Sequence, residues 1–335
     1  MSTPVTPPER FLVRLRPLAA LSVAAVAVVL LAGCAGDGGD SASPSASGGV
    51  TGDLCAAAAP SGDISDAISA SGEVGSVPTL EFAKPIDIDG LTIQRTVMVE
   101  GDGEPLAAGN FVDYAATIVD GATGEVLSES GYTAGEVLPE QISPESGGQI
   151  FGCATVGSRL ALAAATSDEA NPSLVYIIDI LGVTPTTAWG TEQEPVAGLP
   201  TVTLDESGAP TITIPDADPL AETTVVALKT GDGATVEPGD QVLLQYRGVR
   251  WSNGEEFDST WSKGGVPIPL ATTGVVSGFR QALEGQTVGS QVLVSMTPAD
   301  GYGDGEINTT DLKGDTLVFV IDILGTATPA AATAP

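Results

Sequence analysis

Alternating apolar and polar residues mark three segments in the C-terminal third of the chain. A period of two predicts β-strands, because successive side chains of a strand point to opposite faces of its sheet. One apolar face per strand predicts an antiparallel sheet that is covered on one side. The apolar positions are Val242, Leu244 and Tyr246 in the first segment, Val292, Val294 and Met296 in the second, and Leu317, Phe319, Ile321 and Ile323 in the third.

A helical pattern lies between the first two of these strands. In residues 275–286, the apolar residues Phe279, Ala282 and Leu283 follow the spacing i, i+3, i+4, and Gly285 stands where a helix can end. This spacing predicts a short α-helix that covers the apolar face of the sheet. The expected fold class is α+β, a twisted antiparallel β-sheet wrapped on one short α-helix.

The same pattern occurs twice along the chain. Four sequence blocks recur in the same order, and their offset grows from 130 to 143 positions. Collinear blocks of this kind indicate one fold used twice, so we expect two modules of roughly a hundred residues each. The matching blocks are 99–103 with 229–233, 123–130 with 253–260, 155–162 with 287–294, and 173–182 with 316–325.

The N-terminal segment has the features of an export signal. A basic start precedes an apolar run at residues 17–31, which is too short to span a bilayer comfortably. The run ends in Leu-Ala-Gly-Cys, which resembles a bacterial lipoprotein signal in which the Cys34 thiol is acylated and becomes the new N-terminus. An ordinary secretory signal with a chance cysteine is the alternative. Both interpretations place the mature chain outside the cytoplasm.

Composition and the repeat divide the chain into six parts. Gly, Ser, Ala and Asp follow Cys34 and predict a disordered spacer. A stretch rich in Pro, Thr and acidic residues separates the modules, and its TVTL and TITIP segments are candidate edge strands for the second module. The parts are a lipoprotein signal peptide (1–34), a disordered tether and N-terminal flank (35–77), a first module (78–185), a linker (186–220), a second module (221–327) and a disordered tail (328–335).

Charge and residue usage narrow the function classes. The formal net charge is −31 at pH 7, so nucleic acid is not an expected partner, because phosphate binding needs clustered Lys and Arg. The chain has no histidine, which removes Ser/His and Cys/His catalytic pairs and the commonest zinc ligand. Hydrolytic functions are therefore disfavoured, and no cofactor is expected.

Two cysteines remain besides Cys34. In an oxidising compartment a disulfide between Cys55 and Cys153 is favoured over two unrelated thiols, because an unpaired exposed thiol is reactive.

The second module resembles the FKBP-type peptidyl-prolyl cis-trans isomerases, the immunophilins that bind tacrolimus-like macrolides. Six motifs within residues 224–325 follow the order and spacing of that family: GDG, GDQVLLQYRG, GEEFDST, VVSGFRQALEGQTVGSQ, GYG and TLVFVIDIL. The resemblance implies an isomerase without a cofactor, and together with the export signal it predicts a folding catalyst that acts outside the cytoplasm. Its implied partners are proline-containing segments of secreted or cell-surface proteins, and the lipid anchor would hold it at the membrane.

The resemblance also implies the site residues. Carried over one by one, the family's pocket falls on Tyr246, Phe257, Asp258, Val275, Val276, Phe279, Tyr302 and Phe319. The pocket floor is most often Trp in the family and is Phe279 here, and a wall position that is usually aromatic falls on Val266. These changes enlarge or soften the pocket, so they weaken the implied macrolide binding more than the implied isomerase activity.

The expected reaction needs no nucleophile or general base. Rotation about an X-Pro bond breaks no bond, and its barrier of about 18–20 kcal/mol comes from amide resonance. An apolar cup disfavours the planar, charge-separated amide relative to the twisted one, and Phe257, Phe279, Phe319 and Val276 can supply it. The resemblance assigns the donors for the flanking carbonyls to the Val276 backbone N–H and the Tyr302 hydroxyl, and the orientation of Tyr246 to Asp258.

The first module lacks most of this set. Only Tyr176 remains aromatic, opposite Phe319, and the loop that carries Tyr302 is missing. We interpret the first module as a degenerate, catalytically silent copy that spaces, stabilises or binds. Its substitutions are Ala116 for Tyr246, Leu127 for Phe257, Ser128 for Asp258 and Gly147 for Phe279.

Other interpretations stay open. Asp300, Asp304, Gly305 and Asp311 match positions 1, 5, 6 and 12 of a calcium loop, although Tyr302 stands at position 3, position 12 is Asp instead of Glu, and helical flanks are absent. At the level of the whole chain, the alternatives are a non-catalytic extracytoplasmic chaperone or proline-segment binding lipoprotein, and a purely structural surface lipoprotein.

Overall fold

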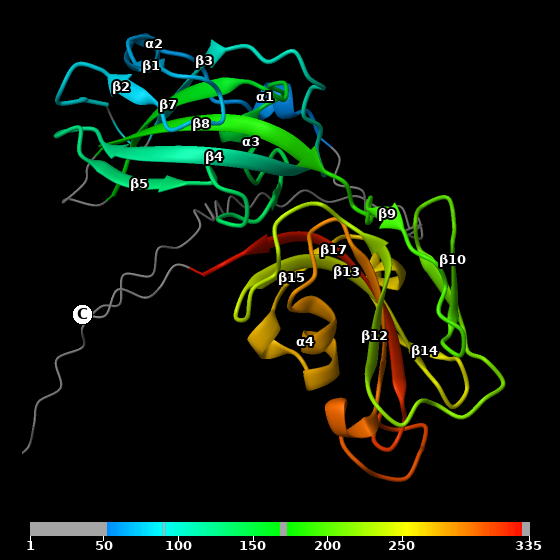
Figure 1. The fold of residues 1–335 in the computed structure, drawn as a ribbon. Helices are drawn as coiled ribbons and strands as arrows, with labels where there is room; N and C mark the ends of the chain where they lie inside the picture. Colours follow the sequence, from blue (N-terminus) through cyan, green and yellow to red (C-terminus); the bar gives the residue numbers. More distant parts are fainter. Residues whose placement is uncertain (1–51, 89, 91, 168–172, 330–335) are drawn as a thin grey trace, which may run out of the picture. The chain divides into compact units, whose positions relative to one another are not determined.

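The computed structural model describes residues 52–88, 90, 92–167 and 173–329, and most of them lie in β-sheet (Figure 1). The expected signal peptide, the acylated Cys34 and residues 330–335 of the expected tail lie outside the described residues. No helix within the described ranges has the length and the apolar character that a membrane crossing requires.

The C-terminal sheet is antiparallel and seven-stranded. Its strand order is β14-β13-β17-β16-β12-β9, and β15 pairs with β13 off this path. The three segments predicted as strands from their alternation lie at its centre. The strands are β9 (Thr191–Glu192), β12 (Thr224–Thr230), β13 (Gln241–Arg250), β14 (Glu256–Ser259), β15 (Ile268–Ala271), β16 (Gln291–Met296) and β17 (Leu317–Ala327).

The predicted helix, α4 (Ser277–Leu283), covers one face of this sheet (Figure 1). Phe279, Ala282 and Leu283 are all buried in the core between helix and strands. The helix packs closely on β16, because a Cβ at Gly278 would lie 2.6 Å from the Cβ of Met296. Past the end of α4, Gly285 has a φ of +84°, a left-handed conformation that glycine adopts at little cost.

The expectation of a sheet that is covered on one side is wrong, because both faces are buried. Leu293, Val318 and Val320 point away from α4 and pack under a hairpin of the preceding segment, with Leu199 and Ile212. The central strands therefore carry apolar residues at consecutive positions, and every residue of β16 is buried.

The segment expected as a linker, 186–220, is part of this covering layer. Its TVTL and TITIP stretches do form β10 (Thr201–Leu204) and β11 (Pro210–Thr213), but these strands pair only with each other. The edge position of the sheet is taken by β9 instead, which pairs with β12. Val202 of β10 and Ile212 of β11 are the strand residues through which the hairpin packs on this face of the sheet.

The N-terminal sheet repeats the same strand order. It runs β5-β4-β8-β7-β3 with β6 paired to β4, as β14-β13-β17-β16-β12 runs with β15 paired to β13. Its helix, α3 (Gly148–Phe151), is a single turn, in keeping with the glycines at residues 147 and 148. The strands are β3 (Ile93–Val99), β4 (Phe111–Asp120), β5 (Val126–Ser130), β6 (Glu140–Gln141), β7 (Arg159–Ala165) and β8 (Ser173–Thr184).

The N-terminal flank is structured over residues 52–77, while residues 35–51 of the expected disordered tether lie outside the described residues. Leu54 and Ile68 are buried against the N-terminal sheet, and a disulfide joins Cys55 to Cys153. The expected module boundary at residue 78 falls between two paired strands. The elements of the flank are α1 (Leu54–Ala57), α2 (Asp63–Asp66) and the hairpin β1 (Ser69–Ser71) and β2 (Thr79–Glu81).

A buried ion pair fastens this hairpin to the N-terminal sheet. Arg159 Nε lies 2.6 Å from Asp179 Oδ1, and both side chains are fully buried. The same guanidinium donates to the carbonyls of Gly72 and Glu73 in the hairpin turn. At the matching pair of the C-terminal sheet, Gln291 donates to Asp322 at 2.7 Å, and burial raises the pKa of Asp322.

Candidate active site

Three aromatic rings form the base of the candidate site. Tyr246 comes from β13, Phe319 from β17 and Phe279 from α4, and all three are buried. The rings of Phe279 and Phe319 meet edge to face at a centroid distance of 5.1 Å, and Tyr246 meets Phe279 in the same way at 5.7 Å. Edge-to-face contacts fix the relative orientation of aromatic rings. The base is therefore a rigid apolar surface.

Phe257 extends this surface along the edge strand β14. Its ring is half-buried and meets Phe319 edge to face at 5.3 Å. The contact depends on Gly248 in β13, because a Cβ there would lie 2.6 Å from Phe319 and 2.8 Å from Phe257. Glycine at this position lets both rings lie against the backbone.

Asp258 follows Phe257 and lies at the rim, where it accepts two hydrogen bonds. The Tyr246 hydroxyl donates to Oδ2 at 2.7 Å, and Lys263 Nζ donates to Oδ1 at 2.5 Å. Lys263 belongs to η1 (Trp261–Lys263), the single 3₁₀ turn that follows β14. A register shift in the pairing of β14 with β13, between Gly248 and Val249, lies beside Asp258.

These contacts shift the pKa values of both Asp258 and Tyr246. Burial raises the pKa of Asp258, but the hydrogen bonds from Lys263 and Tyr246 outweigh it and bring the pKa below the usual value. Burial, with the adjacent Asp258 carboxylate, raises the pKa of the Tyr246 phenol. Asp258 is therefore a carboxylate and Tyr246 a neutral donor at physiological pH.

Val275 and Val276 form another part of the rim. Both are half-buried and pack against the aromatic core, and Val276 directly precedes the first turn of α4. Two further residues that sequence reasoning missed, Ile268 of β15 and Leu312, pack against the same core. The alternation of Ile268 with Leu270 was the signal for the first of them.

The expected wall residue Val266 does not belong to this site. It packs with Leu243 and Leu324, which form a different cluster. Ile268 packs against the aromatic core in its place. Val266 precedes β15, which begins at Ile268.

Tyr302 lies on the loop between β16 and β17 and is 49 % exposed. Its phenol is close enough to Tyr246 to contribute to the raised pKa of that residue. Asp300, just before it in η3 (Pro298–Asp300), accepts hydrogen bonds from Thr223 at 2.5 Å and from Gln281 of α4 at 3.2 Å. The start of the loop is thus tied both to the sheet and to the helix that supports the site.

The contacts of this loop leave no support for a calcium site. Asp300 faces Thr223 and Gln281, while Asp311 accepts from the Lys313 backbone N–H at 3.0 Å. Within the described ranges, no group of three or more acidic, cysteine or histidine side chains is placed to hold a metal ion.

In the N-terminal core Tyr114 meets Phe151 edge to face at 5.5 Å, but these two rings do not stand at the positions of the C-terminal site. The registers of the N-terminal sheet equate Ala116 with Tyr246, because Ala116 pairs with Ile178 as Tyr246 pairs with Ile321. Ser128 lies across from Ile118 as Asp258 lies across from Gly248. Leu127, at the place of Phe257, is 47 % exposed, whereas Phe257 is half-buried against the aromatic core.

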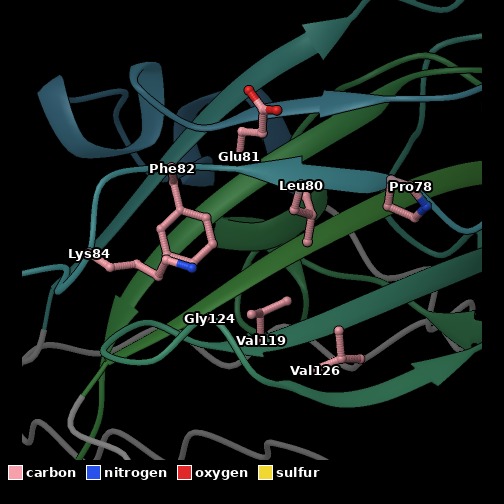
Figure 2. A pocket seen from close by; sticks show the side chains of 8 residues that line it. All are labelled: Pro78, Leu80, Glu81, Phe82, Lys84, Val119, Gly124 and Val126. Carbon is pink, nitrogen blue, oxygen red and sulfur yellow. The ribbon is translucent and has the colours of Figure 1, made fainter.

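The N-terminal sheet does have a cavity of its own, on the face opposite α3. It has a volume of about 310 Å³ and is lined by residues of β2, β4 and β5 and of the connections beside them (Figure 2). None of the residues predicted from the sequence as site residues lines it. Its lining consists of Pro78, Leu80, Glu81, Phe82, Lys84, Val119, Gly124 and Val126.

Comparison with known proteins agrees with this geometry. A family model described as FKBP-type peptidyl-prolyl cis-trans isomerase matches residues 233–324. The chain is 36 % identical over 117 residues to a probable FK506-binding protein of Corynebacterium glutamicum, covering 34 % of this chain and 96 % of that protein. It is 32 % identical over 117 residues to an FK506-binding protein of Streptomyces anulatus, with coverage of 34 % and 94 %.

Among solved structures, FkpA from Escherichia coli matches with 20 % sequence identity and a TM-score of 0.29. That match covers 38 % of this chain and 52 % of FkpA.

Proposed function

The chain belongs to the FKBP-type peptidyl-prolyl cis-trans isomerase family, and we propose that its isomerase activity resides in the aromatic cluster of the C-terminal sheet. The observation that carries this proposal is the convergence of Tyr246, Phe257, Phe279 and Phe319 beneath the Asp258 and Tyr302 rim. These residues come from three strands, one helix and one loop.

The geometry suits rotation about a prolyl bond. A proline ring that rests on the exposed side of Phe257 and Val276 loses water around its imide nitrogen, which disfavours the charge-separated planar amide. The Tyr302 hydroxyl, exposed on its loop, is free to donate to a carbonyl that flanks the proline. The bond between Tyr246 and Asp258 holds the phenol in place and leaves the base of the site without a mobile polar group.

The wider role that we propose is folding catalysis outside the cytoplasm, on proline-containing segments of secreted or cell-surface proteins. Support comes from the residues 1–34, which resemble a lipoprotein signal, and from the disulfide between Cys55 and Cys153, a bond that persists in oxidising compartments. Acylation of Cys34 would anchor the chain to the membrane. Fractionation of cells that express the chain or a Cys34→Ala variant tests this, since the variant should leave the membrane fraction.

We further propose that the N-terminal sheet is a degenerate copy of the same module without isomerase activity. The shared strand order supports a common origin, and Ala116, Leu127 and Ser128 stand where the C-terminal sheet has its site residues. With Ala116 in place of Tyr246 and Leu127 in place of Phe257, the N-terminal sheet lacks two of the rings that form the C-terminal site.

The test is acceleration of cis-to-trans isomerisation of a short X-Pro peptide by the full chain, compared with Asp258→Ala and Tyr302→Phe. Both substitutions should lower kcat/KM. Ser128→Ala, at the matching place of the N-terminal sheet, is the control and should leave the rate unchanged. A folded chain without any acceleration would instead favour a chaperone that binds proline segments without turnover.

A further inference from the structure

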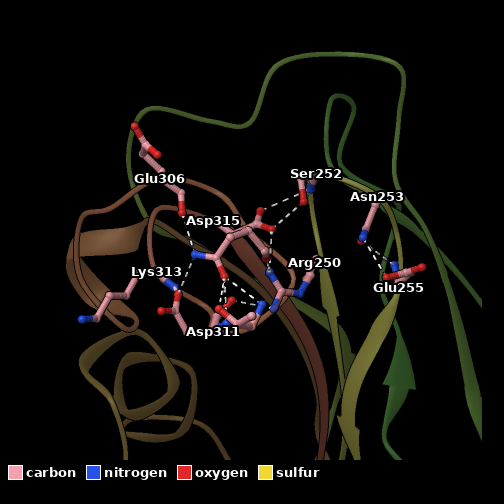
Figure 3. Close-up of polar contacts among 10 residues, drawn as sticks. Arg250, Ser252, Asn253, Glu255, Glu306, Asp311, Lys313 and Asp315 are labelled. Carbon is pink, nitrogen blue, oxygen red and sulfur yellow. Dashed lines mark hydrogen bonds and ion pairs between the residues drawn. The ribbon is translucent and has the colours of Figure 1, made fainter.

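A buried arginine lies beneath the loop that carries Tyr302. Arg250 is the last residue of β13 and is only 9 % exposed. Its guanidinium donates to the backbone carbonyl of Asn308 at 2.9 Å and to that of Asp311 at 2.6 Å (Figure 3). These two bonds hold the far half of the loop through its backbone, whatever side chains the loop carries.

The guanidinium is itself held from the sheet side. Asp315, whose side chain is buried, lies 3.6 Å from the Arg250 guanidinium and accepts a 2.5 Å hydrogen bond from the Ser252 hydroxyl (Figure 3). A buried arginine that is paired and bonded in this way has little freedom, because each N–H that lost its partner would remain desolvated. Arg250 is therefore a rigid anchor for the backbone of the loop.

The loop transmits this restraint to Tyr302. The backbone N–H of Gly314 donates to the carbonyl of Gly303 at 2.9 Å, and the N–H of Gly303 donates to Pro298 at 2.7 Å. The half of the loop that Arg250 holds is thus bonded to the residue next to Tyr302. Leu312, in the held half, also packs against the aromatic core of the site.

The N-terminal sheet offers an internal comparison. Asp120 occupies the position of Arg250, since it pairs with Leu174 as Arg250 pairs with Leu317. Its carboxylate accepts from Thr123 within its own turn. The connection from β7 to β8 is short, from Ala165 to Ser173, so this sheet has no long loop for an arginine to hold.

We propose that Arg250 is a positioning residue of the isomerase, which fixes Tyr302 over the site by anchoring its loop at Asn308 and Asp311. The inference rests on the proposed function of the C-terminal sheet. Arg250 touches no substrate, so removing it should act only through the residue that it positions.

A double-mutant cycle on the full chain tests this. Arg250→Met should lower kcat/KM about three- to tenfold, the range expected when a single hydrogen bond is lost, and Tyr302→Phe should do the same. In the Tyr302→Phe background, Arg250→Met should have almost no further effect, because the group that it positions is gone. Arg250→Lys, which can reach one carbonyl, should restore part of the activity. Arg280→Met, an exposed arginine of α4, is the charge-matched control and should behave as the unmodified chain.

Amide hydrogen exchange gives a readout that does not depend on activity. Arg250→Met should speed exchange at Gly303 and Gly314, while the strand amides of β13 and β17 keep their protection. If Arg250→Met unfolds the sheet, Ser252→Ala, which removes one contact of Asp315, should show the same effects at smaller size.

An inactive unmodified chain would refute the proposed function alone, and amide hydrogen exchange would still test whether Arg250 anchors the loop. Equal losses from Arg250→Met in both backgrounds, or unchanged exchange at both glycines, would overturn the inference.

Discussion

The hydroxyl of Tyr246 donates a 2.7 Å hydrogen bond to Oδ2 of Asp258, and this bond joins the buried base of the site to its rim. The other carboxylate oxygen accepts from Lys263, so one carboxylate receives both a neutral and a charged donor. The negative charge of Asp258 strengthens both hydrogen bonds.

The pH dependence of the site follows from this arrangement. The pKa of Asp258 lies below its usual value, so the carboxylate stays charged above that lowered pKa, and its contribution is lost only as the pH falls through it. We expect kcat/KM to be flat around neutral pH and to fall only below the ordinary Asp range, about pH 3.9. Lys263→Met should raise the pH at which kcat/KM begins to fall, the acid limb of the profile, and should change the rate at neutral pH little.

A pH series on the full chain and on Lys263→Met at low and high salt measures the shift. Lys263 is 68 % exposed, so high salt should move the acid limb of the unmodified chain toward that of the variant. Arg280→Met should leave the limb in place. An identical limb for Lys263→Met would show that Lys263 does not hold the charge of Asp258.

Gly248 should not tolerate even one added methyl group. A Cβ there would press on the Phe319 and Phe257 rings, and overpacking of this kind costs about 1–3 kcal/mol of stability. Because the two rings form the surface of the site, Gly248→Ala should also lower kcat/KM by about tenfold or more, equivalent to about 1.4 kcal/mol.

Gly274→Ala is the matched control, since its added Cβ would have no neighbour closer than 4.0 Å. Unfolding in urea and the peptide assay together separate the two effects. Full activity of Gly248→Ala would show that the ring positions do not limit the rate.

The two sheets should lose different amounts of stability when the buried polar side chain at the matching position, Arg159 or Gln291, is replaced. Arg159→Met leaves the Asp179 carboxylate buried without its charged partner, bonded only by the backbone N–H of Gly75, and frees the hairpin turn, so it should cost about 3–5 kcal/mol. Gln291→Met removes only a neutral donor from Asp322 and should cost about 1–3 kcal/mol. Urea unfolding of both variants measures the difference, and equal losses would contradict the assigned role of the ion pair.

The disulfide should stabilise the N-terminal sheet without affecting catalysis. It joins residues that are 98 positions apart, and removing a native disulfide typically costs about 2–4 kcal/mol. The double variant Cys55→Ala with Cys153→Ala should therefore lower the unfolding midpoint of this part of the chain and leave kcat/KM unchanged. A loss of peptide activity in a folded double variant would show that catalysis does not depend on the C-terminal sheet alone.

Local patterns in the sequence were sufficient for the central strands, for α4 and for the repeat. The spacing of Phe279, Ala282 and Leu283 specifies the buried stripe of α4 without reference to any distant residue. The site residues could be named only through resemblance to a family, because Phe319 or Phe257 alone has the pattern of an ordinary core residue.

The amino-acid sequence by itself determined which side chains avoid water and therefore where strands and helix form. Only the tertiary structure decided which segment covers them: the β10–β11 hairpin over the second face, Ile268 in place of Val266, Lys263 beside Asp258 and Arg250 beneath the loop of Tyr302. The physical reason is that the local periodicity of apolar residues specifies which side chains are buried. Which residue contacts a given side chain depends instead on how distant segments of the module fold together. Arg250 shows this most clearly, because the two groups to which it donates in the loop are backbone carbonyls, which carry no sequence signal.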